Sequence, residues 1–405
     1  MKLTLPLILD GATGTQLQQR GYTGAQCAEA WVLEHPDTIR EIQSDYINAG
    51  SDIVYAPTFA ANRIKLEENG ISGRVAEFNT RLFTLSKENA AGRALVGGDI
   101  APTGKFLPPM GDTSFEELVE VYAEQAAALE AAGADLFAVE TMMTLPEARA
   151  AVLGIRSVSE KPIFVTFTCG TNGKTLTGTD VTAALVVLQG MGVTAFGLNC
   201  STGPEEMLKQ LRRLREYAEI PLICKPNAGL PEMVDGKTVY RTGPETFAAL
   251  VPQMAGCGVG LFGGCCGTTM EHIRALRQAV DGISFNPPAP AHTDELVAST
   301  EKQVFCLPAD FDFGEPVPCD EDLLDALEEA EDDEADGIAI LLTDEEELEN
   351  LGESLYAANL PLCFCCEDAA LLEKALRLYQ GRALYRGSLS GEVLAPLREK
   401  YGLLG

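Results

Sequence analysis

The stretch that decides the fold is Val259-Gly260-Leu261-Phe262-Gly263-Gly264-Cys265-Cys266-Gly267-Thr268-Thr269. It opens as a short apolar run, which is typical of a buried strand. It then reaches two adjacent cysteines among glycines, and glycine adopts backbone conformations that other residues avoid. The pattern predicts a buried strand that ends in a tight turn and presents two thiols at its carboxyl end.

The same arrangement, an apolar run followed by glycine or polar residues, occurs eight times along the first 280 residues. The runs are 5–11, 51–59, 95–102, 135–141, 162–168, 194–200, 221–229 and 258–265. Between them, apolar residues recur at helical spacing, as in 36–49, 115–132, 204–218 and 243–255. Apolar strands that alternate with amphipathic helices predict a parallel sheet covered by helices. Eight such units predict an α/β fold of the (β/α)8 TIM-barrel type.

In such barrels the chemistry takes place at the carboxyl ends of the strands. Six side chains that could bind a ligand or take part in a reaction lie at or just beyond those ends: Asp10, Glu140, Cys200, Asn227, Cys265 and Cys266. Three sulfur ligands with one open position are typical of catalytic zinc. The competing interpretation is that each cysteine is simply buried, as cysteines usually are, and that the two acids cap helices. Because spacing, strand-end placement and glycine context agree for the cysteines, the metal interpretation is favoured.

The overall charge excludes some classes of partner. The chain carries 30 basic and 60 acidic residues, a net charge of −30, which would repel nucleic acids and anionic membranes. Its N-terminal residues lack the pattern of a secretory signal, and no apolar run is long enough to span a bilayer. We therefore expect a cytoplasmic protein whose 12 cysteines are mostly reduced thiols or metal ligands.

The C-terminal part differs in composition. Residues 301–405 hold 26 acidic and 7 basic residues, so they carry −19 of the net charge. A proline-rich segment precedes them, which predicts a barrel over 1–286, a linker over 287–302 and a further domain over 303–405. Its alternating apolar and amphipathic runs predict a small α/β module with too few strands for a second barrel. The cysteines of Cys363-Phe364-Cys365-Cys366 lie in an apolar run without glycine, so we interpret them as packing residues.

Four motifs carry a resemblance to a known family. They are Asp10-Gly11-Ala12-Thr13-Gly14-Thr15, Gly197-Leu198-Asn199-Cys200, Pro226-Asn227-Ala228-Gly229-Leu230-Pro231 and Gly263-Gly264-Cys265-Cys266-Gly267-Thr268. Together they resemble the homocysteine S-methyltransferase family over about residues 1–285, and above all the homocysteine-binding module of cobalamin-dependent methionine synthases. The combination of Asn-Cys upstream with Gly-Gly-Cys-Cys-Gly is highly specific.

The resemblance implies a zinc-dependent methyltransferase that makes methionine from homocysteine. It implies that Cys200, Cys265 and Cys266 hold Zn²⁺, which binds the homocysteine sulfur. It also implies that Asp10 and Glu140 hold the amino acid through its ammonium group. From the same motifs we expect Gly11, Asn199 and Asn227 to bind substrate. One departure is Lys225, where methionine synthases commonly have histidine.

The methyl donor remains open between several sources. The resemblance implies methylcobalamin on a separate corrinoid protein and a separate folate-binding subunit, since no Asp-x-His-x-x-Gly surrounds His35, His272 or His292. Around Gly314-Glu315 the C-terminal module resembles only the opening of a pterin-binding domain. The alternatives are a methyltransferase that uses S-methylmethionine or betaine directly, and a non-catalytic zinc- or thiol-binding subunit.

Overall fold

The computed structural model describes residues 3–234, 237–332 and 335–405. The chain forms two compact units. The first comprises Met1–Leu176, Thr194–Arg215 and Glu219–Ala289, and the second comprises Thr177–Val193, Glu216–Ala218 and Pro290–Gly405.

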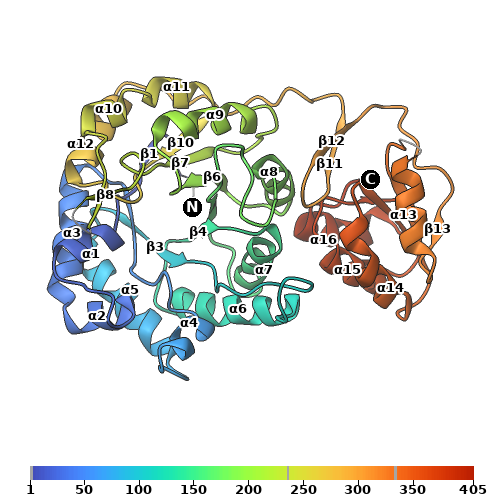
Figure 1. Cartoon of the computed structure of the whole chain (residues 1–405), viewed down its shortest axis with the longest axis horizontal. Helices are drawn as coiled ribbons and strands as arrows, with labels where there is room; N and C mark the ends of the chain where they lie inside the picture. The colour runs from blue at the N-terminus through green and yellow to red at the C-terminus, as the bar shows by residue number, and fades with distance from the viewer. Residues whose placement is uncertain (1–2, 235–236, 333–334) are drawn as a thin grey trace. The chain divides into compact units, whose positions relative to one another are not determined.

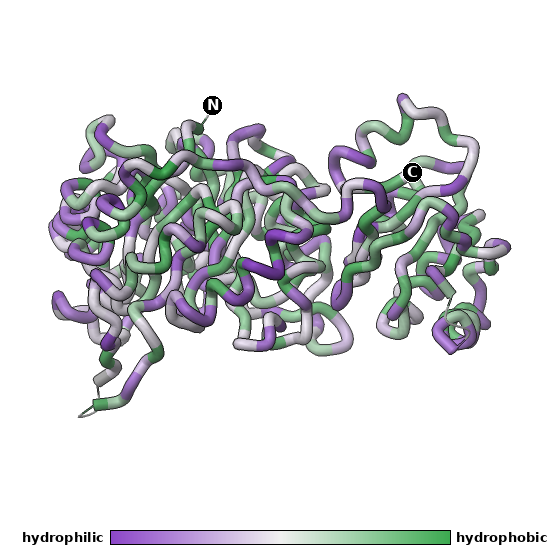
Figure 2. Tube along the Cα trace, turned by 90° about the horizontal axis from the view of Figure 1, so that it is seen from above, coloured by the Kyte–Doolittle hydropathy of each residue, from purple (hydrophilic) through white to green (hydrophobic). Residues whose placement is uncertain are grey.

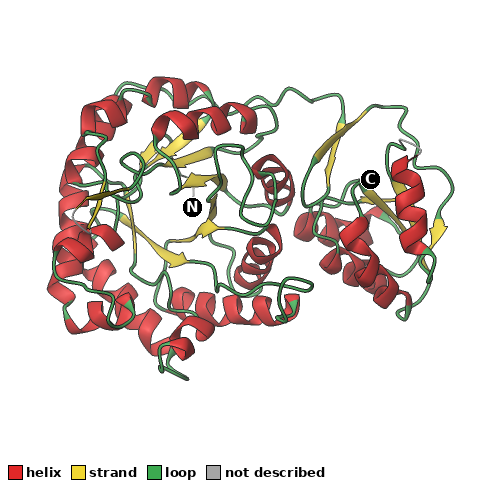
Figure 3. Cartoon of the chain, in the orientation of Figure 1, coloured by secondary structure: helices red, strands yellow, loops and turns green. Residues whose placement is uncertain are grey.

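The first unit is built on eight parallel strands in the order β1-β10-β7-β6-β5-β4-β3-β2 (Figures 1 and 3). The strands are β1 (Leu7–Ile8), β2 (Ile53–Tyr55), β3 (Leu95–Ile100), β4 (Leu136–Met142), β5 (Ile163–Phe167), β6 (Ala195–Asn199), β7 (Leu222–Lys225) and β10 (Val259–Phe262). The first and last members of this order also meet, because the Asp52 N–H donates to the Ile8 carbonyl at 2.7 Å. The sheet is therefore a nearly closed barrel, and the predicted TIM-barrel fold is confirmed.

Helices surround this barrel (Figure 1). They are α1 (Gly14–Gln19), α2 (Ala28–Glu34), α3 (Pro36–Ala49), α4 (Arg63–Glu68), α5 (Val75–Ala90), α6 (Phe115–Ala131), α7 (Leu145–Arg156), α9 (Pro204–Leu214), α10 (Pro244–Ala248), α11 (Val251–Gly256) and α12 (Met270–Val280). Side-chain caps fix several starts, as where Ser114 accepts a hydrogen bond from the Glu117 amide at the start of α6. The single helix predicted over 243–255 is instead two, α10 and α11. Pro252 explains the break, because proline has no N–H to donate to a preceding turn.

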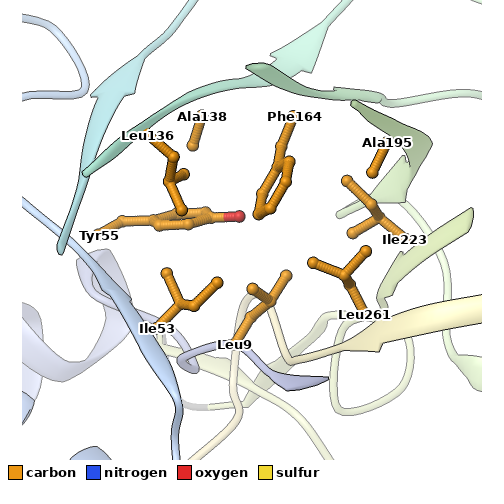
Figure 4. Packing of buried hydrophobic residues seen from close by; sticks show 9 residues of the cluster. All are labelled: Leu9, Ile53, Tyr55, Leu136, Ala138, Phe164, Ala195, Ile223 and Leu261. Carbon is orange, nitrogen blue, oxygen red and sulfur yellow. The ribbon is translucent and has the colours of Figure 1, made fainter. Parts of the chain in front are cut away.

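Packed side chains fill the barrel interior (Figure 4). The cluster comprises Leu9, Ile53, Tyr55, Leu136, Ala138, Phe164, Ala195, Ile223 and Leu261, all buried. Its members alternate along single strands, as Ile53 and Tyr55 do in β2, because every second side chain of a strand points to the same face. The interior is therefore a core rather than a channel, and a site is expected at the carboxyl ends of the strands and in the loops that follow them.

One of these loops carries an element that the sequence did not predict. Between β7 and α10 the chain forms two short antiparallel strands, β8 (Glu232–Val234) and β9 (Lys237–Val239). The residues of β8 are exposed. The segment after β9 returns the chain to the barrel, where the Thr242 amide donates to the Ala228 carbonyl at 2.9 Å.

The second unit is a small α/β module, as predicted. Its parallel sheet has the order β13-β14-β15-β16, and a separate antiparallel pair is formed by β11 and β12. The strands are β11 (Leu296–Ser299), β12 (Val304–Leu307), β13 (Val317–Pro318), β14 (Ile338–Leu342), β15 (Leu362–Cys366) and β16 (Leu384–Tyr385). The helices are α8 (Val181–Gly190), α13 (Leu323–Asp332), α14 (Glu347–Ser354), α15 (Ala369–Leu378) and α16 (Gly391–Tyr401), with a 3-10 turn, η1 (Leu355–Ala357).

The cysteines of β15 belong to the core of this second unit. Cys363 and Cys365 pack in one buried cluster with Ala339 and Leu384, and Cys366 is also buried. The packing interpretation of these cysteines is thus consistent with their surroundings.

Hydrophilic and hydrophobic residues are interspersed along the whole trace of the chain (Figure 2). Within the described residues, we find no helix with the length and apolarity needed to cross a membrane.

Candidate metal centre

Three thiols from two distant segments meet at the carboxyl ends of β6 and β10. The sulfur atoms of Cys200, Cys265 and Cys266 all lie within 4.8 Å of one another. The Sγ atoms of Cys200 and Cys266 are 3.9 Å apart. Tetrahedral zinc with Zn–S bonds of about 2.3 Å places two sulfur ligands roughly 3.8 Å apart. The donor set therefore fits Zn²⁺ in both chemistry and spacing.

A left-handed turn after β6 directs Cys200 toward the other two thiols. Cys200 and Ser201 have φ angles of 60° and 54°, which are uncommon for residues with a side chain. Backbone hydrogen bonds hold this turn: the Cys200 amide donates to the Lys225 carbonyl at 3.2 Å, and the Thr202 amide donates to the Cys200 carbonyl at 2.6 Å. The position of the Cys200 thiol is thus set by pairing with the end of β7.

Glycines shape the turn that carries the other two cysteines. A Cβ on Gly264 would lie 2.5 Å from the Thr268 Oγ1 atom. Gly267 has a φ of +79°, and a Cβ there would lie 2.3 Å from the Tyr240 ring. Side chains at these positions would push apart the segments that hold the thiols, which explains why glycines flank the cysteine pair.

The predicted substrate loop, residues 10–15, is hydrogen-bonded to the same turn. The Gly264 amide donates to the Asp10 carbonyl at 3.0 Å. The Ala12 amide donates to Thr268 Oγ1 at 3.0 Å, and the Gly267 amide donates to Thr15 Oγ1 at 3.2 Å. Gly11 lies in this loop and lines the cavity described below.

The two predicted asparagines lie behind the thiols. Asn199 is fully buried; its Oδ1 accepts from the Thr141 amide at 3.0 Å, and its Nδ2 donates to Thr141 Oγ1 at 2.7 Å. The same Nδ2 lies 4.0 Å from Cys265 Sγ. Asn227 is 3% exposed and its side chain hydrogen-bonds Cys200. Neither asparagine is among the described residues that line the cavity. Their contacts are with the thiols and with the turns that carry them.

The three thiols shift one another's pKa values. Hydrogen bonds from Cys265 and Cys266 lower the pKa of Cys200 far below its ordinary value. In turn, the hydrogen bond to Cys200 raises the pKa of Cys265 and that of Cys266. The acidity of each thiol thus depends on the other two, and the thiolate is the form of cysteine that binds a metal cation.

Beside the thiols lies an ion triad, which comprises Asp10, Glu140 and Lys225. The Lys225 Nζ atom is 3.1 Å from Asp10 Oδ1 and 3.1 Å from Glu140 Oε2. Burial alone would lower the pKa of Lys225, but the two carboxylates outweigh it and raise that pKa well above its ordinary value. Burial raises the pKa of Glu140, and Lys225 opposes that rise. The sequence had marked Lys225 only as a departure from the family pattern.

A cavity of about 450 Å³ joins the thiols to the ion triad. Its lining includes four residues that the sequence reasoning missed: Glu29, Tyr55, Asp99 and Thr141. Asp99 is 6% exposed, and its Oδ1 has no hydrogen-bond partner among the described residues. Burial raises the pKa of Asp99 well above its ordinary value. Tyr55 and Asp99 lie at the ends of β2 and β3, so the strand-end rule used for the other residues would have found them.

In the described part of the second unit, another group of ligand-type side chains lies within 4.8 Å: His292, Glu295 and Cys306. These groups are partly or fully exposed and already bonded, since His292 Nδ1 lies 2.6 Å from Glu295 Oε2. The His292 ring also stacks on Tyr217. Of the remaining histidines, His272 is buried and caps α12, and the His35 ring stacks on Trp31.

The fold and site together define a parallel α/β barrel whose strand ends bring three cysteines to one point beside a cavity. The profile of the homocysteine S-methyltransferase family matches residues 7–280. The chain belongs to this family.

Two methionine synthases are similar in sequence to this chain. The chain is 36% identical to methionine synthase of Mycobacterium leprae in an alignment of 294 residues that covers 68% of this chain and 24% of the relative. It is 36% identical to methionine synthase of Mycobacterium tuberculosis over 297 residues, again 68% of this chain and 25% of the relative. The chain thus spans about a quarter of the length of these relatives.

Solved structures with the same fold include the homocysteine methyltransferase MmuM from Escherichia coli. Its metallated form is 27% identical with a TM-score of 0.59, over 68% of this chain and 96% of MmuM. Its oxidized form is 25% identical with a TM-score of 0.58, over 67% of this chain and 95% of MmuM.

Proposed function

We propose that the chain is a zinc-dependent S-methyltransferase that converts homocysteine to methionine, with the methyl group delivered by a separate methylcorrinoid protein. The observation that carries the proposal is the convergence of Cys200, Cys265 and Cys266 within 4.8 Å, beside a cavity lined by Glu140. Family membership, the metallated state of MmuM and the two methionine synthase relatives support it.

The residues of the chain have distinct parts in this reaction. Cys200, Cys265 and Cys266 would hold Zn²⁺, which favours the deprotonated form of a substrate thiol and orients it. Glu140 faces the cavity and suits the ammonium of an amino acid. The substrate sulfur forms a bond to the methyl carbon as the bond from that carbon to the donor breaks. The donor keeps the electron pair of the broken bond, and the thiol proton passes to solvent.

Exposed apolar side chains on the loops beyond the strand ends support a protein donor. They are Met110, Leu176, Leu230 and Met233, between 61% and 80% exposed. They lie in the loops that follow β3, β5 and β7, which form the same end of the barrel as the thiols. Large apolar side chains left exposed at the end of the barrel that holds the site suit a surface that docks another macromolecule. We include in the proposal a folate-binding subunit that recharges the corrinoid protein, and a cytoplasmic location.

The cavity size supports a second candidate, a methyltransferase that takes the methyl group from a small donor such as S-methylmethionine or betaine. A volume of about 450 Å³ lies within the range of pockets that bury drug-sized ligands. Homocysteine alone is smaller than such ligands, so a small donor has room beside it.

One experiment separates the candidates. Zinc-loaded protein and homocysteine are incubated with a methylcorrinoid protein, methylcobalamin, S-methylmethionine or betaine, and methionine is quantified by mass spectrometry. We expect methionine from the corrinoid donors. Turnover with S-methylmethionine or betaine alone would overturn the first donor assignment. If no donor supports turnover, and homocysteine leaves the zinc X-ray absorption spectrum unchanged, the chain is a non-catalytic subunit.

A further inference from the structure

The end of the cavity that holds the ion triad, where the substrate amine would bind, already contains a cation of the protein itself. Lys225 lies at the carboxyl end of β7, where it is paired in register with Asn199 of β6. Its side chain is 3% exposed, and its Nζ contacts Asp10 and Glu140 at 3.1 Å each. The same Nζ lies 4.0 Å from the centre of the Tyr55 ring. With both acids ionised, the ion triad has a net charge of −1.

The two carboxylates are not equivalent. Asp10 is 4% exposed at its side chain and uses both oxygens, since Oδ1 meets Lys225 and Oδ2 accepts from the Tyr55 amide at 2.8 Å. Glu140 is 14% exposed and uses only Oε2. Its side-chain hydrogen bond among the described residues is the one that Lys225 Nζ donates to Oε2. Glu140 therefore has an oxygen to offer a ligand, whereas Asp10 is committed to the protein.

We propose that Lys225 sets the charge of the amine-binding end at −1, so that Glu140 Oε1 alone receives the substrate ammonium and Asp10 is a positioning residue for Lys225. This rests on the proposed function in that the ligand is an amino-thiol. It revises the expectation that Asp10 and Glu140 grip the ammonium as a pair.

Charge pairing in a buried site supports this division. Buried charges are tolerated when they are paired and hydrogen-bonded, and an uncompensated one is costly. Two carboxylates with Lys225 between them leave one negative charge, which one ammonium neutralises. Once the substrate ammonium is bound, the net charge of the triad and the ammonium together is zero. Without the lysine, the same two acids would face a single ammonium with one charge left over.

The charge assignment is tested with substitutions that change the triad in steps. Asp10→Asn makes the triad neutral, and adding Lys225→Met returns it to −1 without leaving two unpaired acids. Binding of homocysteine to zinc-loaded protein is measured by calorimetry. The comparison ligand is 4-mercaptobutanoate, the same thiol without the amine. We expect Asp10→Asn to raise the homocysteine Kd at least about tenfold, because the triad loses the net negative charge that the ammonium would neutralise. The double variant should return to within about threefold of the wild type.

A second pair of variants tests which oxygen receives the ammonium. Glu140→Gln also makes the triad neutral, but adding Lys225→Met should not restore homocysteine binding, because the receiving oxygen is gone. In every variant the Kd of 4-mercaptobutanoate should change less than about threefold. Zinc content and the melting temperature show that each variant is folded, and Lys161→Met, which removes a lysine paired with Glu130 at 2.8 Å, is the matched control.

The outcomes are decisive in both directions. If the Asp10→Asn and Lys225→Met double variant binds homocysteine no better than Asp10→Asn alone, Asp10 grips the ammonium directly and the proposal is wrong. It is also wrong if wild type binds homocysteine no more tightly than 4-mercaptobutanoate. Because these are binding measurements, a failure to form methionine counts against the proposed function and leaves this test intact.

Discussion

Replacing one thiol of the converging set should separate a metal ligand from a packing cysteine. We consider Cys265→Ser against Cys365→Ser. Cys265 lies within 4.8 Å of the two other thiols at the barrel end, whereas Cys365 is 7% exposed in the core cluster of the second unit. Both substitutions replace one sulfur by one oxygen, so their side-chain volumes change alike.

The expected magnitude follows from the number of ligands. Structural zinc sites with four ligands bind with about 10–16 kcal/mol, which is roughly 2.5–4 kcal/mol for each ligand. In this site the chain supplies three sulfurs, so losing one removes a third of the protein ligands. The affinity for zinc should therefore fall by about 10²–10³-fold in Cys265→Ser. Cys365→Ser should leave it unchanged within about threefold and lower the melting temperature, because a hydroxyl enters an apolar cluster.

The assay is competition for zinc against a chromophoric chelator of known affinity, with zinc content measured by elemental analysis. Melting temperatures of the zinc-loaded proteins distinguish a lost ligand from a lost fold. An equal loss of zinc in both variants would show that the cysteines of β15 also bind metal. Unchanged zinc affinity in Cys265→Ser would refute the tri-cysteine centre itself.

Three further outcomes are expected. Asn199→Ala leaves the Thr141 amide without its partner, so the free energy of unfolding should fall by about 1–3 kcal/mol in denaturant titrations; no change would mean that another group satisfies that amide. Gly267→Ala should lose zinc affinity as well as stability, whereas Gly282→Ala, with a φ of +90° but open space, should lose only about 1–2 kcal/mol of stability. Removing zinc with a chelator should abolish methionine formation and lower the melting temperature. The far-ultraviolet circular dichroism should stay unchanged, because the barrel core contains no thiol of the site; loss of that signal would show that the metal holds the fold.

Much of the barrel could be predicted because its signals are local. Each strand is a short apolar run, and α3 was predicted with the observed bounds, Pro36–Ala49, from its helical spacing and from Pro36 in the first turn. The strands β13 and β16 were missed because two residues each are too few to show a period. The run over 243–255 was predicted as one helix, but the missing N–H of Pro252 favours a break, and the structure has two helices there.

The meeting of the thiols could be predicted for a different reason. Cys200 and Cys266 are far apart in sequence, but both follow strands, and parallel strands of a barrel end on one side. Strand-end position therefore carries three-dimensional information. It does not carry the register between neighbouring strands, nor the direction of a long side chain. For that reason the contacts of Lys225 with Asp10 and Glu140 were not foreseen, although both acids were placed at strand ends.

The backbone around the thiols explains why the site depends on residues that touch no ligand. Thr141, with φ of 64°, joins Cys200 and Ser201 in the left-handed region. Such residues persist only where the surroundings over-determine them. Asn199 supplies that constraint, because its amide bonds both the backbone and the side chain of Thr141 while its own chain leads directly into Cys200. The ends of β4 and β6 are therefore fixed together, and the geometry of the sulfur centre is set before any metal binds.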